Sequence, residues 1–338
     1  AIDGLGKVYT WGYNNYGQLG DGSVTESYIP ININLDNIIN VSAGYGHCLA
    51  VDSNGIVYSW GLNNKGQLGN GNNANGESPI RISNLQNITQ IDCGYHHSVA
   101  LDSTGNVWTW GYNNRGQLGN GTIADSNVPS KIDDMSDVTA VSAGYYHTLA
   151  LKSDGTVWSW GYNNYGQLGD NTKVQKTSPV QITSLNDIIA ISAGNNYSMA
   201  LKSDGSVWTW GYNNRGQLGL GNTTAVSVPT CVTALSNISH ISAGYYHSTA
   251  LSNSGQIYTW GYNNYGQLGN ASNTQSTVPQ QLNNTISFDY ISNKYNSTLA
   301  VDTDGKVYAW GYNNHHQLGT SDTSNGNAPI QTNIENID

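Results

Sequence analysis

Residues 160–169 read Trp-Gly-Tyr-Asn-Asn-Tyr-Gly-Gln-Leu-Gly, and this phrase decides the fold because it recurs along the whole chain. Its copies begin at Trp11, Trp60, Trp110, Trp160, Trp210, Trp260 and Trp310, 49 or 50 residues apart. Apart from its variable sixth position, only Leu62, in place of Tyr, and His316, in place of Gly, depart from the pattern. A period of this length indicates a solenoid, a propeller or an array of small units.

Each unit predicts four antiparallel strands, which in the third full unit cover residues 141–144, 147–151, 156–160 and 178–182. Asp154-Gly155 is a hairpin signal because both residue types accept a positive φ. An alanine recurs in the second strand and predicts a site that admits only a methyl group: Ala50, Ala100, Ala150, Ala200, Ala250 and Ala300. We therefore expect one domain over residues 1–338, an all-β, seven-bladed β-propeller of four-stranded antiparallel blades.

One blade is expected to be incomplete. Ala1-Ile2-Asp3 aligns with Ala50-Val51-Asp52, so the sequence opens late in a second strand, and six copies of the first strand accompany seven Trp-Gly phrases. We expect either that the native chain continues beyond this segment or that strand exchange with another chain completes the blade. Lys294, in place of the glycine that ends the other first strands, indicates a degenerate edge or a local specialisation.

The motifs closely resemble those of the regulator of chromosome condensation (RCC1) repeat family. The residues that carry the resemblance are Ala-Gly-Tyr-Tyr-His-Thr-Leu-Ala-Leu at 143–151 and Gly-Thr-Val-Trp-Ser-Trp-Gly-Tyr-Asn-Asn-Tyr-Gly-Gln-Leu-Gly at 155–169. The resemblance spans essentially the whole chain. It implies the seven-bladed propeller, and it includes bacterial members such as the propeller-type β-lactamase inhibitor protein.

Composition excludes several classes of function. With 12 basic and 22 acidic side chains the net charge is −10, and no basic run offers a footprint for nucleic acid. No apolar run approaches the roughly 18 residues of a membrane span. Three cysteines form no disulfide framework and have no metal-site spacing. The low charge and the abundance of Asn, Ser and Thr favour a secreted or cell-surface bacterial protein.

Strand parity predicts which face makes contacts. The turn after each first strand and the loop after each third strand must share one face, here called the top face, whereas the Asp-Gly hairpins lie on the bottom face. The candidate partner-binding residues on the top face are Tyr16, Tyr45, Tyr95, His96, Arg115, Tyr145, Tyr146, Tyr165, Asn195, Asn196, Arg215, Tyr245, Tyr246, Tyr265, Tyr295 and His315. Tyr13 and its equivalents either join them or fill gaps between blades.

Tyrosine with Asn and an occasional Arg is typical of antibody binding loops, where Tyr offers a large, stiff contact area. The sequence therefore predicts a non-enzymatic, inhibitor-like module that binds a protein partner through the top face. The alternative is a multivalent, lectin-like surface that binds glycans. Guanine-nucleotide exchange on a small GTPase, as in the founding member of the family, is disfavoured because no unit carries an insertion.

No catalytic, cofactor or metal site is predicted. The chain has no nucleophile elbow and no phosphate-cradling loop. His47, His97, His147 and His247 recur at the start of the second strand, but Tyr197 and Ser297 take this position elsewhere. We expect these histidines to bond to the backbone of a neighbouring blade. The Trp, Gly, Gln and Leu residues of the phrase are also expected to be structural.

Overall fold

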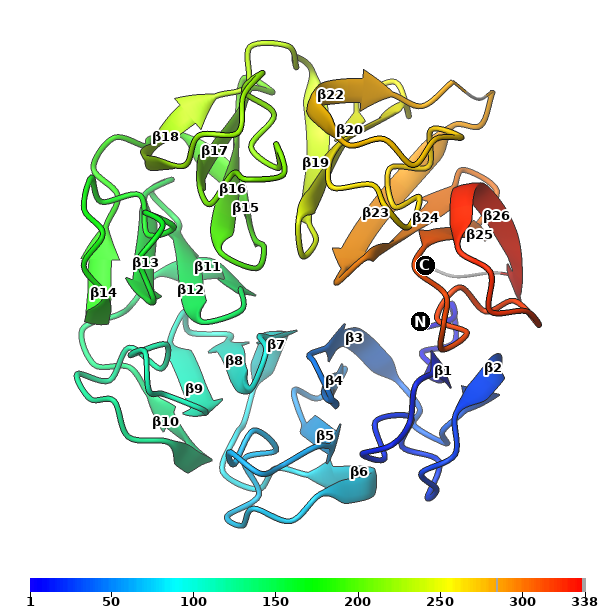
Figure 1. Cartoon of the computed structure of the whole chain (residues 1–338). Coiled ribbons are helices and arrows are strands. Elements are labelled where there is room, and N and C mark those ends of the chain that lie inside the picture. The colour runs from blue at the N-terminus through cyan, green and yellow to red at the C-terminus, as the bar shows by residue number, and fades with distance from the viewer. Residues whose placement is uncertain (284, 336–338) are drawn as a thin grey trace.

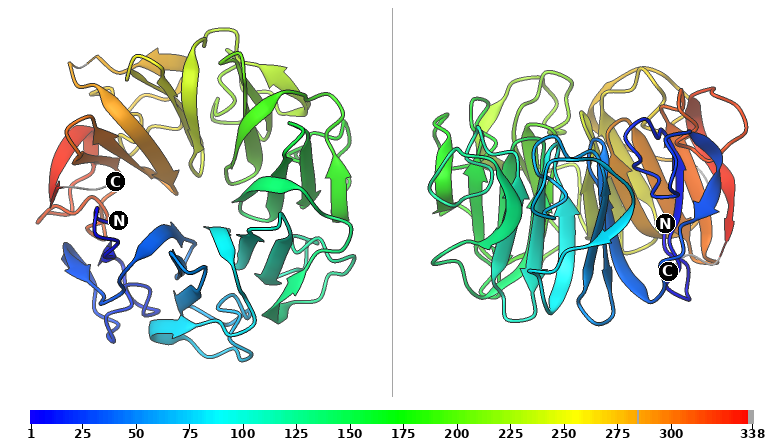
Figure 2. Two further views of the ribbon diagram at one scale, coloured as in Figure 1. Left: turned by 180° about the vertical axis from the view of Figure 1, so that it is seen from behind. Right: turned by 90° about the horizontal axis from the view of Figure 1, so that it is seen from below.

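The structure is a computed structural model that describes residues 1–283 and 285–335. These residues form a ring of antiparallel β-sheets around a central axis, and no helix occurs among them (Figure 1). Six of the sheets have four strands each, joined in chain order, and we call them blades I to VI. Seen from the side, the blades stand next to one another as a disc, with both ends of the chain on the same side of the ring (Figure 2).

The strand bounds repeat closely from blade to blade. Blade I contains β3 (Ile38–Ala43), β4 (His47–Asp52), β5 (Val57–Gly61) and β6 (Gly76–Arg81), and blade II contains β7 (Ile88–Cys93), β8 (His97–Asp102), β9 (Val107–Gly111) and β10 (Ser126–Lys131). Blade III contains β11 (Val138–Ala143), β12 (His147–Lys152), β13 (Val157–Gly161) and β14 (Lys176–Gln181), and blade IV contains β15 (Ile188–Ala193), β16 (Tyr197–Lys202), β17 (Val207–Gly211) and β18 (Val226–Cys231). Blade V contains β19 (Ile238–Ala243), β20 (His247–Ser252), β21 (Ile257–Gly261) and β22 (Ser276–Gln281), and blade VI contains β23 (Phe288–Lys294), β24 (Ser297–Asp302), β25 (Lys306–Gly311) and β26 (Gly326–Glu335).

The first Trp-Gly phrase forms a smaller sheet, so the described residues contain six four-stranded blades and not seven. Strand β1 (Tyr9–Gly12) pairs with β2 (Ser27–Asn32) in a two-stranded sheet. An isolated bridge between Ile2 and Val8 lies beside this sheet. The alignment of the repeats accounts for the smaller sheet. Residues 1–3 align with the end of a second strand, and no residue of this sheet aligns with a first strand.

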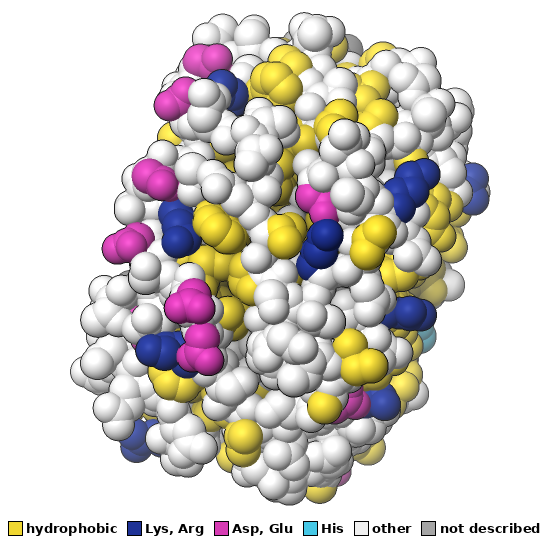
Figure 3. Space-filling view, turned by 90° about the vertical axis from the view of Figure 1, so that its left-hand side faces the viewer, with side chains coloured by type: hydrophobic (Ala, Val, Ile, Leu, Met, Phe, Trp, Pro, Cys, Tyr) yellow, Lys and Arg dark blue, Asp and Glu magenta, His cyan; other side chains and the backbone are white. Residues whose placement is uncertain are grey.

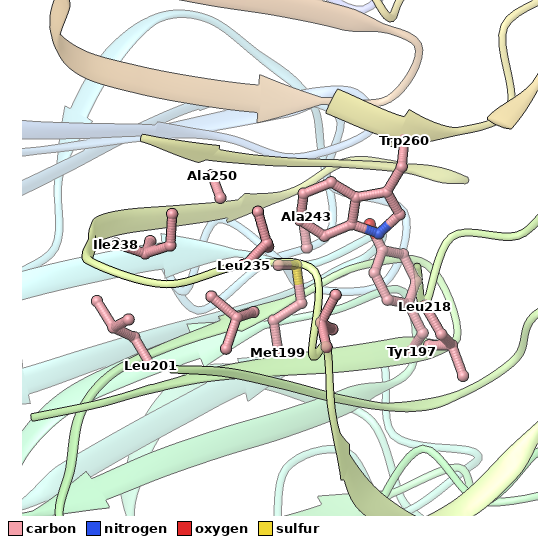
Figure 4. Packing of buried hydrophobic residues seen from close by; sticks show 11 residues of the cluster. Tyr197, Met199, Leu201, Leu218, Leu235, Ile238, Ala243, Ala250 and Trp260 are labelled. Atoms are coloured by element: carbon pink, nitrogen blue, oxygen red, sulfur yellow. The ribbon is translucent and has the colours of Figure 1, made fainter. Parts of the chain in front are cut away.

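The core lies between the blades, since each sheet packs one face on the preceding blade and the other on the following one. The cluster between blades IV and V joins Met199 and Leu201 to Ile238 and Trp260, all at most 3% exposed (Figure 4). Ala250 lies in the same cluster and is fully buried. The equivalent alanines of the other blades are also 0% exposed, which confirms the crowded site that the sequence predicted.

The tryptophans that open the phrases tie consecutive sheets together. Each indole Nε1 donates a hydrogen bond to the carbonyl oxygen of the phrase glutamine one unit earlier, as Trp160 does to Gln117 at 2.9 Å. Trp11 donates to Gln317 O at 3.0 Å, which joins the two-stranded sheet to blade VI and closes the circle. Gly119 allows the indole to approach: its φ is +69°, and a Cβ there would lie 2.7 Å from Trp160 Nε1. The structural role predicted for the Trp and Gly residues of the phrase thus corresponds to this contact between the indole and the glycine.

Candidate functional site

The top face is built from two sets of segments at one end of the strands. In blade III they are the turn between β11 and β12 and the long loop between β13 and β14. Because neighbouring strands are antiparallel, these segments lie together, and all the candidate partner-binding residues belong to them. Most of these side chains are partly exposed, with Tyr45 at 42% and Tyr165 at 36%. Asn195 differs, since it is only 5% exposed.

Five tyrosines meet over the central axis and form what we call the inner ring. They are Tyr45, Tyr95, Tyr145, Tyr245 and Tyr295. Tyr95 and Tyr145 are stacked with ring centroids 3.9 Å apart. The circle closes through Tyr245, Tyr295 and Tyr45, with centroid separations of 6.0 and 6.1 Å. Such pairs contribute about 0.5–1.5 kcal/mol each beyond simple burial, so the inner ring is a stiff platform.

A second circuit of aromatic contacts, the outer belt, surrounds the inner ring. Its members are Tyr13, Tyr16, His96, Tyr112, Tyr146, Tyr162, Tyr165, Tyr212, Tyr246, Tyr262, Tyr265, Tyr312 and His315, and Tyr45 of the inner ring completes it. Neighbouring blades are linked through it, as where Tyr165 meets Tyr212 at 4.4 Å. Tyr13 and its equivalents therefore take part in the aromatic surface as half-buried members.

Burial changes the pKa of several side chains on this surface. Burial raises the pKa of Tyr145 far above its usual range, and burial together with Tyr245 raises the pKa of Tyr246 to about 12. Burial also lowers the pKa of His96 to about 4, with Lys65 acting in the same direction. Tyr145, Tyr246 and His96 therefore present uncharged hydroxyl and imidazole groups that both donate and accept hydrogen bonds.

The aromatic pattern breaks in blade IV, where Asn195-Asn196 stand in place of the ring-bearing pairs of blades II, III and V. The inner ring passes this blade by a direct contact between Tyr145 and Tyr245 at 5.8 Å. A hollow of about 210 Å³ opens at the break and is lined by Arg115 together with tyrosines of blades III and V and the two asparagines. Asn196 is held in place, since it donates to Asn195 Oδ1 at 3.0 Å and accepts from Gln167 Nε2 at 3.2 Å.

Cations of the long loops lie over the rings of the next blade. Arg115 lies 5.2 Å from the ring centroid of Tyr162, and Arg215 lies at the same distance from that of Tyr262. Lys65 stacks in the same way but also pairs with Asp125 at 3.7 Å. Within the described ranges neither arginine has a carboxylate within 4 Å, so their guanidinium groups offer their donors to solvent or to a partner.

Sequence reasoning did not select a ring of exposed asparagines on the same face. The fifth residue of the phrase is exposed in every copy, at Asn15, Asn64, Asn114, Asn164, Asn214, Asn264 and Asn314. The preceding asparagine is instead buried and holds the loop, as Asn63 does by accepting from Leu68 N and donating to Ala74 O, both at 2.9 Å. A signal was available, because the fifth residue never changes while the sixth varies freely.

The central channel is bridged beneath the inner ring by residues that are unique among the repeats. Lys294 Nζ, at the end of β23, donates to Cys93 O of blade II at 2.8 Å and lies 3.5 Å from Asp92 Oδ1. The other copies carry Gly in place of Lys294 and Ser in place of Asp92. Lys294 is therefore a local specialisation that links two blades across the axis.

The recurring histidines are structural, although their partner differs from the expected one. His147 is fully buried, and its Nε2 lies 3.0 Å from Ser198 Oγ of the next blade, whose hydroxyl donates to Gln167 O. His47, His97 and His247 make the same contact with Ser or Thr hydroxyls. The predicted backbone partner was wrong for His97, His147 and His247, because a hydroxyl lies between the imidazole and the carbonyl, whereas His47 also forms a backbone hydrogen bond with His97 of the next blade.

No group of three or more His, Cys, Asp or Glu side chains in the described part of the chain could hold a metal ion. Among the described residues, no helix has the length and the apolar character that crossing a bilayer requires.

Comparison with known families assigns the chain. The model of the RCC1-like domain matches residues 126–337, which is more than half of the sequence. The chain belongs to the RCC1 repeat family. Models of the regulator of chromosome condensation (RCC1) repeat also match this RCC1-like propeller at residues 6–51 and 54–101, and in a second version at 38–67 and 88–117. The resemblance seen in the sequence is thereby confirmed. A search of curated proteins finds no match.

Solved structures with the same fold come from human and yeast proteins. The crystal structure of human WBSCR16 aligns with a TM-score of 0.87 at 24% identity, over 97% of this chain and 95% of that one. Yeast Prp20p, described with its binding properties to Gsp1p and histones, aligns with a TM-score of 0.88 at 25% identity, over 99% and 87%. Yeast RCC1 (Prp20) bound to Kap60 aligns equally well at 24% identity, over 99% and 85%.

Proposed function

We propose that this RCC1-like propeller is a non-enzymatic recognition module that binds a protein partner through its top face. The observation that carries the proposal is the pair of concentric aromatic circuits, the inner ring and the outer belt, on one end of the disc. Each is held by contacts between blades, so the tyrosines lose little side-chain freedom when a partner covers them. Rigid tyrosines flanked by Asn and Arg are the residues that concentrate binding energy at protein interfaces.

The two faces differ in charge as well as in composition. Carboxylates gather in the turns of the bottom face, among them Asp102, Asp133, Asp134, Asp137, Asp154, Asp187 and Asp204. Along the outer wall of the disc, Asp and Glu side chains are concentrated at one edge (Figure 3). The top face instead carries aromatic rings and two arginines that pair with no carboxylate among the described residues, so the net charge of −10 does not describe the surface proposed for contact.

A captured partner that depends on the top face would test the proposal. We would use the chain as bait in extracts and culture medium of its source, next to a variant with Tyr45, Tyr165 and Tyr265 changed to Ser. These three are spread around the face and partly exposed, so the variant is expected to fold. The matched control changes Asp154 and Asp204 of the bottom face to Asn. We expect a protein that the parent and the control retain and that the tyrosine variant loses; equal recovery by all three would refute the proposal.

Glycan binding remains a second candidate because one observation favours it. The exposed asparagines of the phrase are repeated identically around the face, and asparagine amides bond well to sugar hydroxyls while tyrosines stack on the sugar rings. A lectin of this kind would bind several equivalent glycans, and changing Asn164 alone would lower the number of bound glycans without abolishing binding. A protein partner would instead depend on a few positions in particular blades.

Exchange activity on a GTPase is less well supported. The binding of Gsp1p in the Prp20p description belongs to that protein. In the described part of this chain the loop between the third and fourth strands has the same length in blades I to V, so none carries an inserted wedge. We therefore place this activity behind protein recognition and glycan binding.

A further inference from the structure

We propose that the hollow at Asn195-Asn196 is a carboxylate-binding subsite, which receives an Asp or Glu side chain of the protein partner and pairs it with Arg115. The inference rests on the proposed function and narrows it to one position on the top face. It follows from the shape of the hollow, from the charge of its lining and from the placement of Arg115, taken in turn below.

The hollow exists because small side chains replace large ones. Blades III and V place tyrosine pairs at the positions that Asn195 and Asn196 occupy in blade IV. The aromatic rings of Tyr146 and Tyr246 therefore remain as walls with no ring between them, and a space of about 210 Å³ opens. An inward-pointing side chain of a partner would fill this space.

The lining is rich in donors and contains one charge. Arg115 is its single ionised group, and the residues around it are tyrosines and asparagines. Burial raises the pKa of the Tyr145, Tyr146, Tyr245 and Tyr246 phenols, so their hydroxyls stay protonated and donate. A cationic, donor-rich pocket without a carboxylate is complementary to an anion, and a carboxylate accepts two parallel N–H bonds from a guanidinium group.

Arg115 is already oriented for this task. Its guanidinium lies over the ring of Tyr162 at 5.2 Å, which fixes its plane while its N–H groups remain unpaired with any carboxylate of the described chain. A carboxylate that enters the hollow can form two parallel N–H···O bonds with this guanidinium, which makes a charge-assisted pair stronger than a single neutral hydrogen bond. Arg215 stacks on Tyr262 at the same distance but does not line the hollow. Arg81, an exposed arginine at the end of β6 and away from the top face, serves as the control for the role of Arg115.

A protein carboxylate fits better than other anions. The chain has no basic run, and nucleic acid needs many cations to neutralise its phosphates, so one arginine in this hollow does not suit a polyanion. One guanidinium inside a tyrosine-lined hollow suits one carboxylate on an otherwise uncharged surface. Acidic sugars share this group, and they are an outcome of the test below.

The test uses a phage-displayed library of random twelve-residue peptides selected on the immobilised full chain. Each selected peptide is then measured against Arg115→Gln, Asn196→Tyr and the control Arg81→Gln. We expect enrichment of peptides with an essential Asp or Glu, and a loss of affinity of at least tenfold in Arg115→Gln. Asn196→Tyr, which restores the tyrosine of blades III and V, should fill the hollow and abolish binding. Arg81→Gln should leave the affinity within about twofold.

The outcomes separate this inference from the function on which it rests. Peptides that need top-face tyrosines but contain no essential acid, or that respond equally to Arg115→Gln and Arg81→Gln, would overturn the subsite and leave protein recognition standing. Peptides that bind independently of the top face, or no enrichment at all, would count against both. Binding of uronic or sialic acid glycans that depends on Arg115, with no such peptide, would overturn the assignment to a protein partner.

Discussion

Replacing His147 by Tyr should make the protein more resistant to acid. Burial lowers the pKa of His147 from about 6.5 to about 3, and the same holds for His97 and His247. In the native state the buried imidazole stays unprotonated at pH values at which the unfolded chain binds a proton. Its contribution to the unfolding free energy is therefore fully present above the unfolded pKa and is lost as the pH drops below about 6.5. At about pH 5 each such histidine costs about 2 kcal/mol of unfolding free energy.

The chain itself shows that tyrosine fits this position. In blade IV Tyr197 is fully buried, and its hydroxyl donates to His247 O and accepts from Ser248. His147 faces Ser198 in the same way, and Gly144 leaves room for the ring as Gly194 does. His147→Tyr therefore removes one titrating group while keeping a hydroxyl-bonded ring, and the unfolding free energy at about pH 5 should fall about 2 kcal/mol less from its value at about pH 7.5.

Urea unfolding followed by tryptophan fluorescence at both pH values measures this difference. Effects of other titrating groups cancel, because parent and variant share them. His315→Tyr makes the same exchange at a half-exposed position of the top face and serves as the control. If parent and His147→Tyr lose equal stability on acidification, or if the control changes as much as the variant, burial of the imidazole is not the cause and the reasoning fails.

Two further substitutions test the contacts that hold the ring. Trp160→Phe removes the bond from the indole to Gln117 O and leaves a buried carbonyl with one partner fewer, so the unfolding free energy should fall by about 1–3 kcal/mol; an unchanged urea midpoint would contradict the structural role of the tryptophan. Lys294→Gly should lower the unfolding free energy by about 0.2–1 kcal/mol, since the pair with Asp92 is partly exposed. Asp92→Ser should then lower the unfolding free energy less in the Lys294→Gly background than in the parent. Additive effects in this double-mutant cycle would show that the two residues are not coupled.

The period of the phrase was enough to predict the strands and the face that carries the loops. Both depend on local signals, such as Asp154-Gly155 for a hairpin, and on the parity of antiparallel strands. The recurring alanines were read correctly for the same reason: a small residue repeated at one register position indicates crowding in every blade. The strands, loops and alanines that repeat in the sequence also repeat in the structure, so one unit was sufficient to predict those of the others.

The contacts across the axis could not be predicted in this way. Tyr145 meets Tyr245, and Lys294 reaches Asp92, because the ring brings together blades that are not consecutive in the sequence. The spacing of residues along the chain does not indicate how wide the central channel is. The hydroxyl between His147 and the next backbone was missed for a related reason, since it depends on how closely neighbouring blades pack and not on either blade alone.

The hydrogen bond from Trp11 to Gln317 O closes the ring of blades. This seam is the most loosely packed of the contacts between a phrase tryptophan and the preceding phrase. A Cβ on Gly319 would lie 3.5 Å from the indole nitrogen of Trp11, whereas at the equivalent glycines of the other six links it would lie 2.6–2.9 Å away. Trp11 is also half-buried, while the other phrase tryptophans are buried. A closed circle has no terminal repeats to fray, so local opening must begin at this seam. Amide hydrogen exchange should then spread outward from β1 and β26, and the hollow at blade IV, on the far side of the circle, should be among the last parts of the top face to open.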